Sequence, residues 1–341
     1  MAEAGDSTRI LVVRRDNIGD LVCTTPLLRA LRAQLPASFI VALVNRYNEP
    51  VLHGNPDLDA VHSYQKAKHR RPGESIPGVY WRRLKTMAGL RRQRFDWLLL
   101  PGGIQASTAT AVRMIAPRRV LVRGTEDAAA GAHEVEQACH LLVRMGLRYE
   151  VPAQRVVPDA AIRQRLAATL ESRLGFRPGL VIGVHVSARK ASQRWAAERF
   201  VDLILRLPAA PGTAFMLLWA PGSAGNSQHP GDDEKAVRIA AGLQGMPLAP
   251  VATHRLEELI AALALCDRVI CADGGAMHVA AALGKPIVCL FGDSDAARWH
   301  PWGTPYELLQ PGSRNVADIM VEDVMHACER LWARLPRESG P

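Results

Sequence analysis

Asp20 is the first residue whose type and position could do chemistry. It ends the segment RRDNIGD, which follows an apolar, β-branched run over Ile10–Val13 and precedes leucines at helical spacing from Leu21 to Leu35. This order predicts a strand, a loop with a tight turn at Gly19, and a helix with Asp20 near its N-terminus. A carboxylate in that place can cap the helix, or it can act as a general base toward a hydroxyl group.

A second loop, made of small residues, follows a predicted strand at Arg268–Cys271. Successive small residues at the start of a helix let backbone N–H groups approach an anion, and the helix dipole favours phosphate there. His278, one turn into that helix, can donate a hydrogen bond or add positive charge, or it can be a packing residue. Neither GxxxxGK[ST] nor GxGxxG occurs, so we expect phosphate binding without nucleotide hydrolysis. The residues of this loop are Asp273, Gly274, Gly275, Ala276, Met277 and His278.

Other candidate patterns are weaker. Asp293 and Asp295 match the DxD pair that holds a divalent metal in one class of sugar transferases, but three-letter matches are common by chance, and we expect no metal site. His133, Glu134 and His140 lack the spacing of the HExxH zinc pair. The cysteines lie in apolar segments without paired CxxC motifs, so we expect buried, reduced thiols. They are Cys23, Cys139, Cys266, Cys271, Cys289 and Cys328.

The elements that must position these loops alternate along the chain. Short, uniformly apolar strands separated by helices predict α/β architecture with parallel, doubly wound sheets covered on both faces. We expect strands at Phe39–Val44, Trp97–Leu100, Val120–Val122, Leu180–Val186, Ala214–Trp219 and Pro286–Phe291. We expect helices near 105–116, 133–146, 196–207, 233–243, 255–266 and 276–283.

The length of 341 residues exceeds what one hydrophobic core usually serves, so two domains are expected. The alternating pattern weakens between 151 and 178, which carry three prolines in polar sequence. We therefore expect one Rossmann-like domain over 1–170 and a second over 178–320, facing each other across a cleft at the carboxyl ends of their strands. A helix within 321–341 is expected to pack back across both domains.

The excess of positive over negative charge lies entirely in the first half of the chain. Residues 1–175 hold 26 Lys and Arg against 16 Asp and Glu, whereas residues 176–341 hold 16 against 17. Between Lys66 and Arg94, ten cations face the single acid Glu74. Such a cluster can be a solvated face, or it can bind an anionic partner such as a lipid surface or nucleic acid. Few aromatic residues and the lack of a nucleic-acid-binding motif argue against nucleic acid.

Taken in order, the motifs resemble glycosyltransferase family 9, the heptosyltransferases of lipopolysaccharide core synthesis, over about residues 9 to 335. The matching features are Ile18-Gly19-Asp20 with Pro26, Asn55-Pro56 with Asp59, Trp195 with Glu198-Arg199-Phe200, Asp273–Gly284, and Phe291-Gly292. The resemblance implies a GT-B fold and metal-independent, inverting transfer of heptose from ADP-heptose. It places Asp20 at the catalytic-base position and the loop from Asp273 to His278 at the donor diphosphate.

This sequence departs from the family pattern at two positions. The family usually has a lysine two residues before the tryptophan that matches Trp195, and here that residue is Gln193. Arg194 and Lys190 lie beside it, and we assign all three, with Gly19, to the donor site. The customary threonine after the loop aspartate is Gly274. Another nucleotide sugar therefore stays open as donor, as does a GT-B-shaped nucleotide-sugar epimerase.

The resemblance also implies an anionic glycolipid acceptor and no bound cofactor. The N-terminus lacks a basic start and an apolar core, so we expect a cytoplasmic protein, working at the inner face of the inner membrane. Over Val79–Leu90 the apolar residues recur at helical spacing among cations, as on an amphipathic helix near anionic lipid. The apolar set is Tyr80, Trp81, Leu84, Met87 and Ala88.

We assign acceptor binding to Lys68, Arg70 and Arg71, in a basic loop before this helix. Replacing all three by glutamine should raise the KM for a phosphorylated acceptor and flatten its salt dependence, because surface charges are screened within about 10 Å at 0.1 M salt. The measurement is acceptor kinetics across a salt series, with the donor KM as the internal control. Unchanged acceptor kinetics at low salt would leave these cations as a solvated face.

Overall fold

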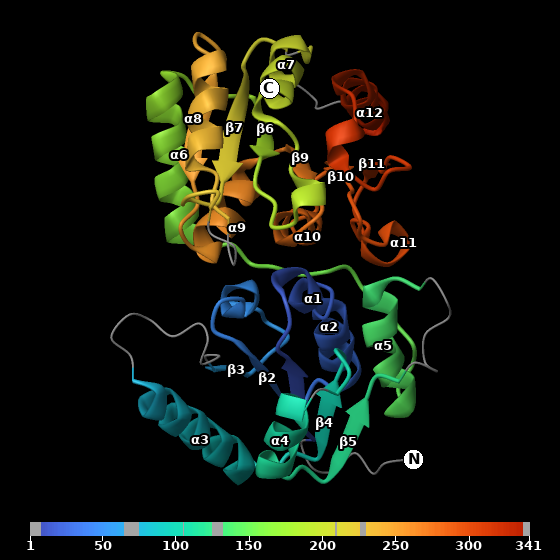
Figure 1. Ribbon diagram of the computed structural model, residues 1–341. Coiled ribbons are helices and arrows are strands. Elements are labelled where there is room, and N and C mark those ends of the chain that lie inside the picture. Colours follow the sequence, from blue (N-terminus) through green and yellow to red (C-terminus); the bar gives the residue numbers. More distant parts are fainter. Residues whose placement is uncertain are drawn as a thin grey trace. The chain divides into compact units, whose positions relative to one another are not determined.

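Two parallel β-sheets organise the chain, each in its own compact unit: residues 1–157 form the first unit and residues 158–341 the second. The structure, a computed structural model, describes residues 8–64, 75–104, 106–124, 132–208, 210–225 and 230–336 (Figure 1). Lys68, Arg70 and Arg71 lie outside the described residues.

The first unit contains a five-stranded sheet in the order β3-β2-β1-β4-β5, with every neighbouring pair parallel. Its strands are β1 (Arg9–Arg14), β2 (Phe39–Asn45), β3 (Ala60–Tyr64), β4 (Trp97–Leu100) and β5 (Arg119–Val122). Its helices are α1 (Ile18–Val22), α2 (Thr25–Gln34), α3 (Ile76–Arg92), α4 (Ala106–Ile115) and α5 (Glu134–Arg144). Helix α3 packs beside α4, and α2 beside α5.

The second unit repeats this plan with a six-stranded parallel sheet in the order β11-β10-β9-β6-β7-β8. Its strands are β6 (Leu180–His185), β7 (Thr213–Trp219), β8 (Leu248–Ala252), β9 (Arg268–Ala272), β10 (Ile287–Leu290) and β11 (Tyr306–Leu309). Its helices are α6 (Ala160–Leu174), α7 (Ala197–Arg206), α8 (Asp233–Gly242), α9 (Leu256–Leu265), α10 (Gly275–Ala282), α11 (Ala296–Trp299) and α12 (Val321–Arg334).

The strand orders determine where ligands can bind. In each sheet the first strands are added one after another toward one edge, and the later strands are then added toward the other edge. The direction in which strands are added therefore reverses between β1 and β4 in the first sheet, and between β6 and β9 in the second. Parallel α/β sheets bind ligands beyond the carboxyl ends of the strands at such a reversal. Both loops selected from the sequence follow a strand at one of these two places.

The α/β class with doubly wound parallel sheets is confirmed, but two local predictions are wrong. Gly19 lies inside α1 and not in a turn, and the expected single helix from Leu21 to Leu35 is divided into α1 and α2 at Cys23 and Thr24. All six cysteines are free and buried, as expected.

Helix α6 occupies the stretch over which the sequence pattern weakened. Asp159 caps its first turn by accepting a hydrogen bond from the Ile162 N–H at 2.8 Å, and Gly175 ends it in the left-handed conformation. Leu170 alone among its residues is buried, so the helix has almost no apolar periodicity. It packs on α9 and β8 of the second unit, and the closing helix α12 packs on α7, β10 and β11 of the same unit.

Candidate active site

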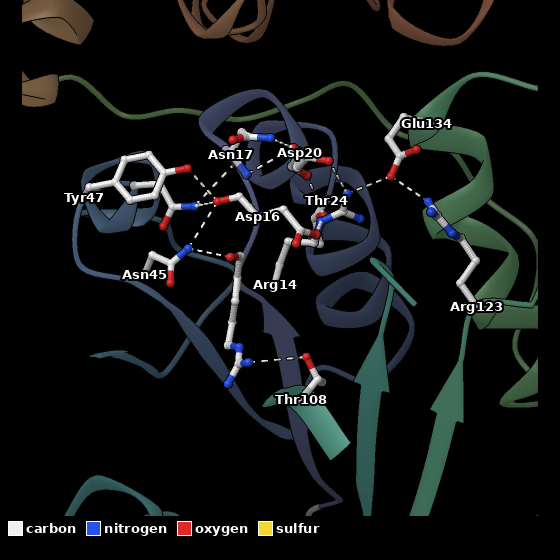
Figure 2. Close-up of polar contacts among 12 residues, drawn as sticks. Arg14, Asp16, Asn17, Asp20, Thr24, Asn45, Tyr47, Thr108, Arg123 and Glu134 are labelled. Atoms are coloured by element: carbon white, nitrogen blue, oxygen red, sulfur yellow. Dashed lines mark hydrogen bonds and ion pairs between the residues drawn. The ribbon is translucent and has the colours of Figure 1, made fainter. Parts of the chain in front are cut away.

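The loop after β1 places Asp20 at the reversal point of the first sheet. Asn17 is the N-cap of α1, and Asp20 stands three residues later, where its Oδ2 atom accepts hydrogen bonds at 3.1 Å from both the backbone N–H and the side-chain amide of Asn17. Its other oxygen, Oδ1, accepts one from Nη2 of Arg14 at 2.6 Å (Figure 2). The carboxylate therefore caps the helix and also forms an ion pair.

Arg14, the last residue of β1, is at the centre of a buried charge network. Its guanidinium is 2% exposed and contacts Asp20, Asp16 at 3.0 Å and Glu134 at 2.8 Å. Glu134 is completely buried at the start of α5, and the same Oε1 atom accepts a second hydrogen bond from Arg123 at 2.6 Å. Glu134 thus links β1 to the segment after β5 (Figure 2).

The network lowers the pKa of Asp20. Burial by itself would raise the pKa of Asp20, but the charge of Arg14 and the hydrogen bonds from Arg14 and Asn17 bring that pKa below its ordinary value. Burial would likewise lower the pKa of Arg14, but Asp20, Glu134 and Asp16 raise it. Asp20 is consequently ionised at neutral pH.

Neighbouring strands hold the loop backbone in place. Asn45, at the end of β2, donates from its amide to the carbonyl oxygens of Arg15 at 2.5 Å and of Asp16 at 3.2 Å, and the Tyr47 hydroxyl donates to the Asp16 carbonyl at 2.6 Å. Gly102, after β4, gives the charged side chains room, since a Cβ there would lie 2.4 Å from Oδ2 of Asp16. Asp20 is therefore carried by a fixed loop.

In the second unit, the loop after β9 reaches the corresponding reversal point. Gly274 is exposed and caps α10 with φ of 157°, a backbone conformation that L side chains rarely adopt. The first N–H groups of a helix have no intrahelical acceptor, so the start of α10 at Gly275 offers donors to an anion. Ala276, Met277 and His278 are buried, and the His278 ring meets that of Trp299 edge to face at 5.9 Å.

Gln193, in a short 3-10 turn after β6, is connected directly to this loop. Its side-chain amide donates to Oδ2 of Asp273 at 2.7 Å and to the Ser294 hydroxyl at 3.0 Å. Burial raises the pKa of Asp273, and the hydrogen bond with Ser294 and the charge of Lys190 only partly oppose it. Gln193 therefore orders the loop without adding positive charge.

The cations near Gln193 have acidic partners. Lys190 forms an ion pair with Asp293 at 3.0 Å in which both side chains are largely solvent-accessible, and Arg194 pairs with Asp232 and donates to the Ala188 carbonyl. Asp295 caps α11 by accepting from the Ala297 N–H at 3.1 Å. Across the part of the chain that the structure describes, no three His, Cys, Asp or Glu side chains gather as metal ligands would.

The structure brings together the second-unit residues assigned to the donor, Lys190, Gln193 and the loop from Asp273, around the carboxyl ends of β6, β9 and β10. Gly19 and Asp20 belong to the first unit. Sequence reasoning missed Glu134, which it set aside as part of a failed zinc motif. Only its position at a helix start, beside His133, was visible in the sequence, because its partner Arg14 is 120 residues away.

The model of glycosyltransferase family 9 (heptosyltransferase) matches residues 85–325. The chain belongs to this family. It is therefore a glycosyltransferase. It is 25% identical to lipopolysaccharide heptosyltransferase 3 of Escherichia coli K12 over an alignment of 348 positions, which covers 92% of this chain and 95% of the relative.

Solved structures agree on the fold. The family 9 glycosyltransferase of Veillonella parvula superimposes with a TM-score of 0.78 at 20% identity, covering 97% of this chain and 98% of that one. The E. coli heptosyltransferase WaaC with ADP-2-deoxy-2-fluoro heptose superimposes with a TM-score of 0.71 at 18% identity, covering 95% and 99%. The GT-B fold is thereby confirmed.

No helix among the described residues is long and apolar enough to cross a membrane.

Glu134→Gln should destabilise the first unit by about 3–5 kcal/mol, because it leaves the buried guanidinium of Arg14 and the partly buried one of Arg123 without their shared carboxylate. Urea unfolding followed by circular dichroism measures the change. The matched control is Glu150→Gln, in the same unit, whose 3.3 Å pair with Arg148 is largely exposed and should contribute less than about 1 kcal/mol. Equal stability of the two variants would mean that the network does not hold the loop.

Proposed function

We propose that this glycosyltransferase moves heptose from ADP-heptose to a phosphorylated glycolipid of the lipopolysaccharide inner core, with inversion at the anomeric carbon and without a metal. The observation that carries the proposal is Asp20, an ionised carboxylate on a fixed loop at the reversal point of the first sheet. Relatives named as lipopolysaccharide heptosyltransferases, and the WaaC structure with an ADP-heptose analogue, support the choice of donor and acceptor. Family membership favours transfer over epimerisation.

In the proposed reaction, the acceptor hydroxyl transfers its proton to Asp20 as its oxygen attacks the anomeric carbon. The bond from that carbon to the diphosphate oxygen breaks, and the diphosphate leaves with the bonding electrons. A general base must lie within hydrogen-bond reach of the hydroxyl and must be unprotonated. Arg14 secures the second condition, at the cost of some basicity.

The second unit would bind the donor and stabilise the charge that develops on the leaving diphosphate. The N–H groups at the start of α10 are fixed donors, and fixed donors stabilise developing charge without reorganisation. Lys190, whose charge acts on Asp273, would supply positive charge in place of the lysine that the family usually has at the position of Gln193, whereas Arg194 is paired with Asp232. Asp293 and Asp295 are already engaged by Lys190 and by the α11 cap, which supports transfer without a metal.

Asp20→Asn should lower kcat by about 100-fold or more with little change in donor affinity, because the amide keeps the shape but cannot accept the proton. Asp16→Asn is the matched control: it also removes a carboxylate from Arg14, but should cost far less turnover. Steady-state kinetics of both variants is the measurement. An equal loss of kcat in the two variants would mean that the loss comes from a perturbed Arg14 and not from a missing base.

The pH profile gives a second check on the same residue. Because the pKa of Asp20 lies below the ordinary aspartate value of about 3.9, kcat/KM should show no acid limb from this group above about pH 4. An acid limb near pH 6.5 that persists in Asp20→Asn would assign the base to a histidine instead.

The donor assignment is tested by thermal shift with a panel of nucleotide sugars in EDTA. A true donor at 100 times its Kd should stabilise the protein by about 2.7 kcal/mol, and EDTA should change neither that shift nor turnover. Stabilisation by a different nucleotide sugar alone would correct the donor. Loss of turnover in EDTA, restored by Mg²⁺ or Mn²⁺, would assign metal binding to Asp293 and Asp295.

A further inference from the structure

Helix α3 presents apolar side chains on two sides. Met87 and Leu90 are buried in the core of the first unit. Tyr80, Trp81 and Leu84 are 51%, 69% and 49% exposed. These three residues form what we call the α3 ridge. The sequence placed Met87 on the same lipid-facing side as these three residues, whereas the structure buries Met87.

The ridge is continuous along the helix. At 3.6 residues per turn, its three side chains fall within about 100° of the helix circumference, together with exposed Ala88. An apolar stripe of that width is what a helix normally buries against a partner. Figure 1 shows α3 along the outer margin of the first unit.

Positive charge borders the ridge. The helix carries five cations and no acid over its 17 residues, and Arg82, Lys85 and Arg92 are exposed. The Arg83 guanidinium lies 5.3 Å from the centres of both the Tyr64 and Tyr80 rings, so it supports one end of the ridge from the protein side. Aromatic and aliphatic side chains flanked by cations match the headgroup region of an anionic bilayer.

We propose that α3 docks on an anionic lipid bilayer, with the α3 ridge entering the headgroup region and the flanking cations binding lipid phosphates. Five cations require the helix to lie along the surface and not across the membrane. A second copy of the chain fits the ridge poorly, because pairing two α3 helices would bring ten cations together without an acid between them.

This inference rests on the proposed function for its purpose, since a glycolipid acceptor must be reached at a bilayer. Its test is independent of turnover. If donor binding and the Asp20 variant contradict the proposed function, vesicle binding can still hold, and the reverse is also true.

The experiment is co-sedimentation of the full chain with vesicles of phosphatidylglycerol and phosphatidylethanolamine, and with neutral phosphatidylcholine vesicles. Wild type should bind the anionic vesicles only, and Leu84→Ser combined with Trp81→Ser should weaken binding about tenfold. Leu205→Ser is the matched control, because Leu205 is a similarly exposed leucine, 54%, on a different helix, α7. Arg82→Gln with Lys85→Gln should also weaken binding and reduce its salt dependence.

Lipids brominated in their acyl chains separate insertion from surface adsorption. They should quench part of the tryptophan fluorescence of wild type, and this part should vanish in Trp81→Phe while vesicle binding persists. Equal vesicle binding by the Leu84 and Leu205 variants, or equal quenching with and without Trp81, would overturn the proposal. So would a ridge variant that changes only the oligomeric state or the binding of single-stranded nucleic acid.

Discussion

The burial of one guanidinium, that of Arg14, is the constraint on which the first unit depends. A buried charge is tolerated only when it is paired and hydrogen-bonded, and Arg14 meets three carboxylates at the carboxyl end of the central strand. Asp16 and Asp20 come from the adjacent loop, but Glu134 comes from α5 and is shared with Arg123. The network therefore ties β1, α1, β5 and α5 to one point, and Asp20 is held there as an anion. The ionised state of Asp20 and the packing of these elements therefore have the same physical origin.

The second unit repeats the architecture, but its loop carboxylate accepts a hydrogen bond from an amide and not from a guanidinium. Asp273 follows the central strand β9 as Asp16 and Asp20 follow β1, yet its partner is the neutral amide of Gln193. Burial raises the pKa of Asp273, whereas the charge of Arg14 and the hydrogen bonds from Arg14 and Asn17 lower that of Asp20. The two sheets, built on one plan, thus carry carboxylates whose pKa values are shifted in opposite directions.

Topology explains why both loops are in comparable places. In each sheet the chain adds strands on one side of the first strand and then adds the later strands on its other side. The connections that leave two adjacent strands, β1 and β4 or β6 and β9, therefore run in opposite directions from their carboxyl ends. Glycines accommodate the close approaches there: Gly102 beside Asp16, and Gly292 against the Ser192 carbonyl. Side chains at these ends are carried by strands whose own burial is nearly complete, so they are rigidly supported.

The sequence by itself determined the parallel α/β class, most strand positions and the two loops, because uniformly apolar strands and small residues at helix starts are local signals. It did not reveal α6, whose exposed surface leaves no apolar period, and it placed a turn at Gly19 where the helix had already begun. It recognised neither the role of Glu134 nor the burial of Met87 on α3. Both depend on what lies next to a residue in space: Glu134 meets a guanidinium 120 residues away, and the side of α3 that is buried is decided by the sheet it packs on. Periodicity along a chain reports which residues share a face, and only the tertiary structure decides which face is covered.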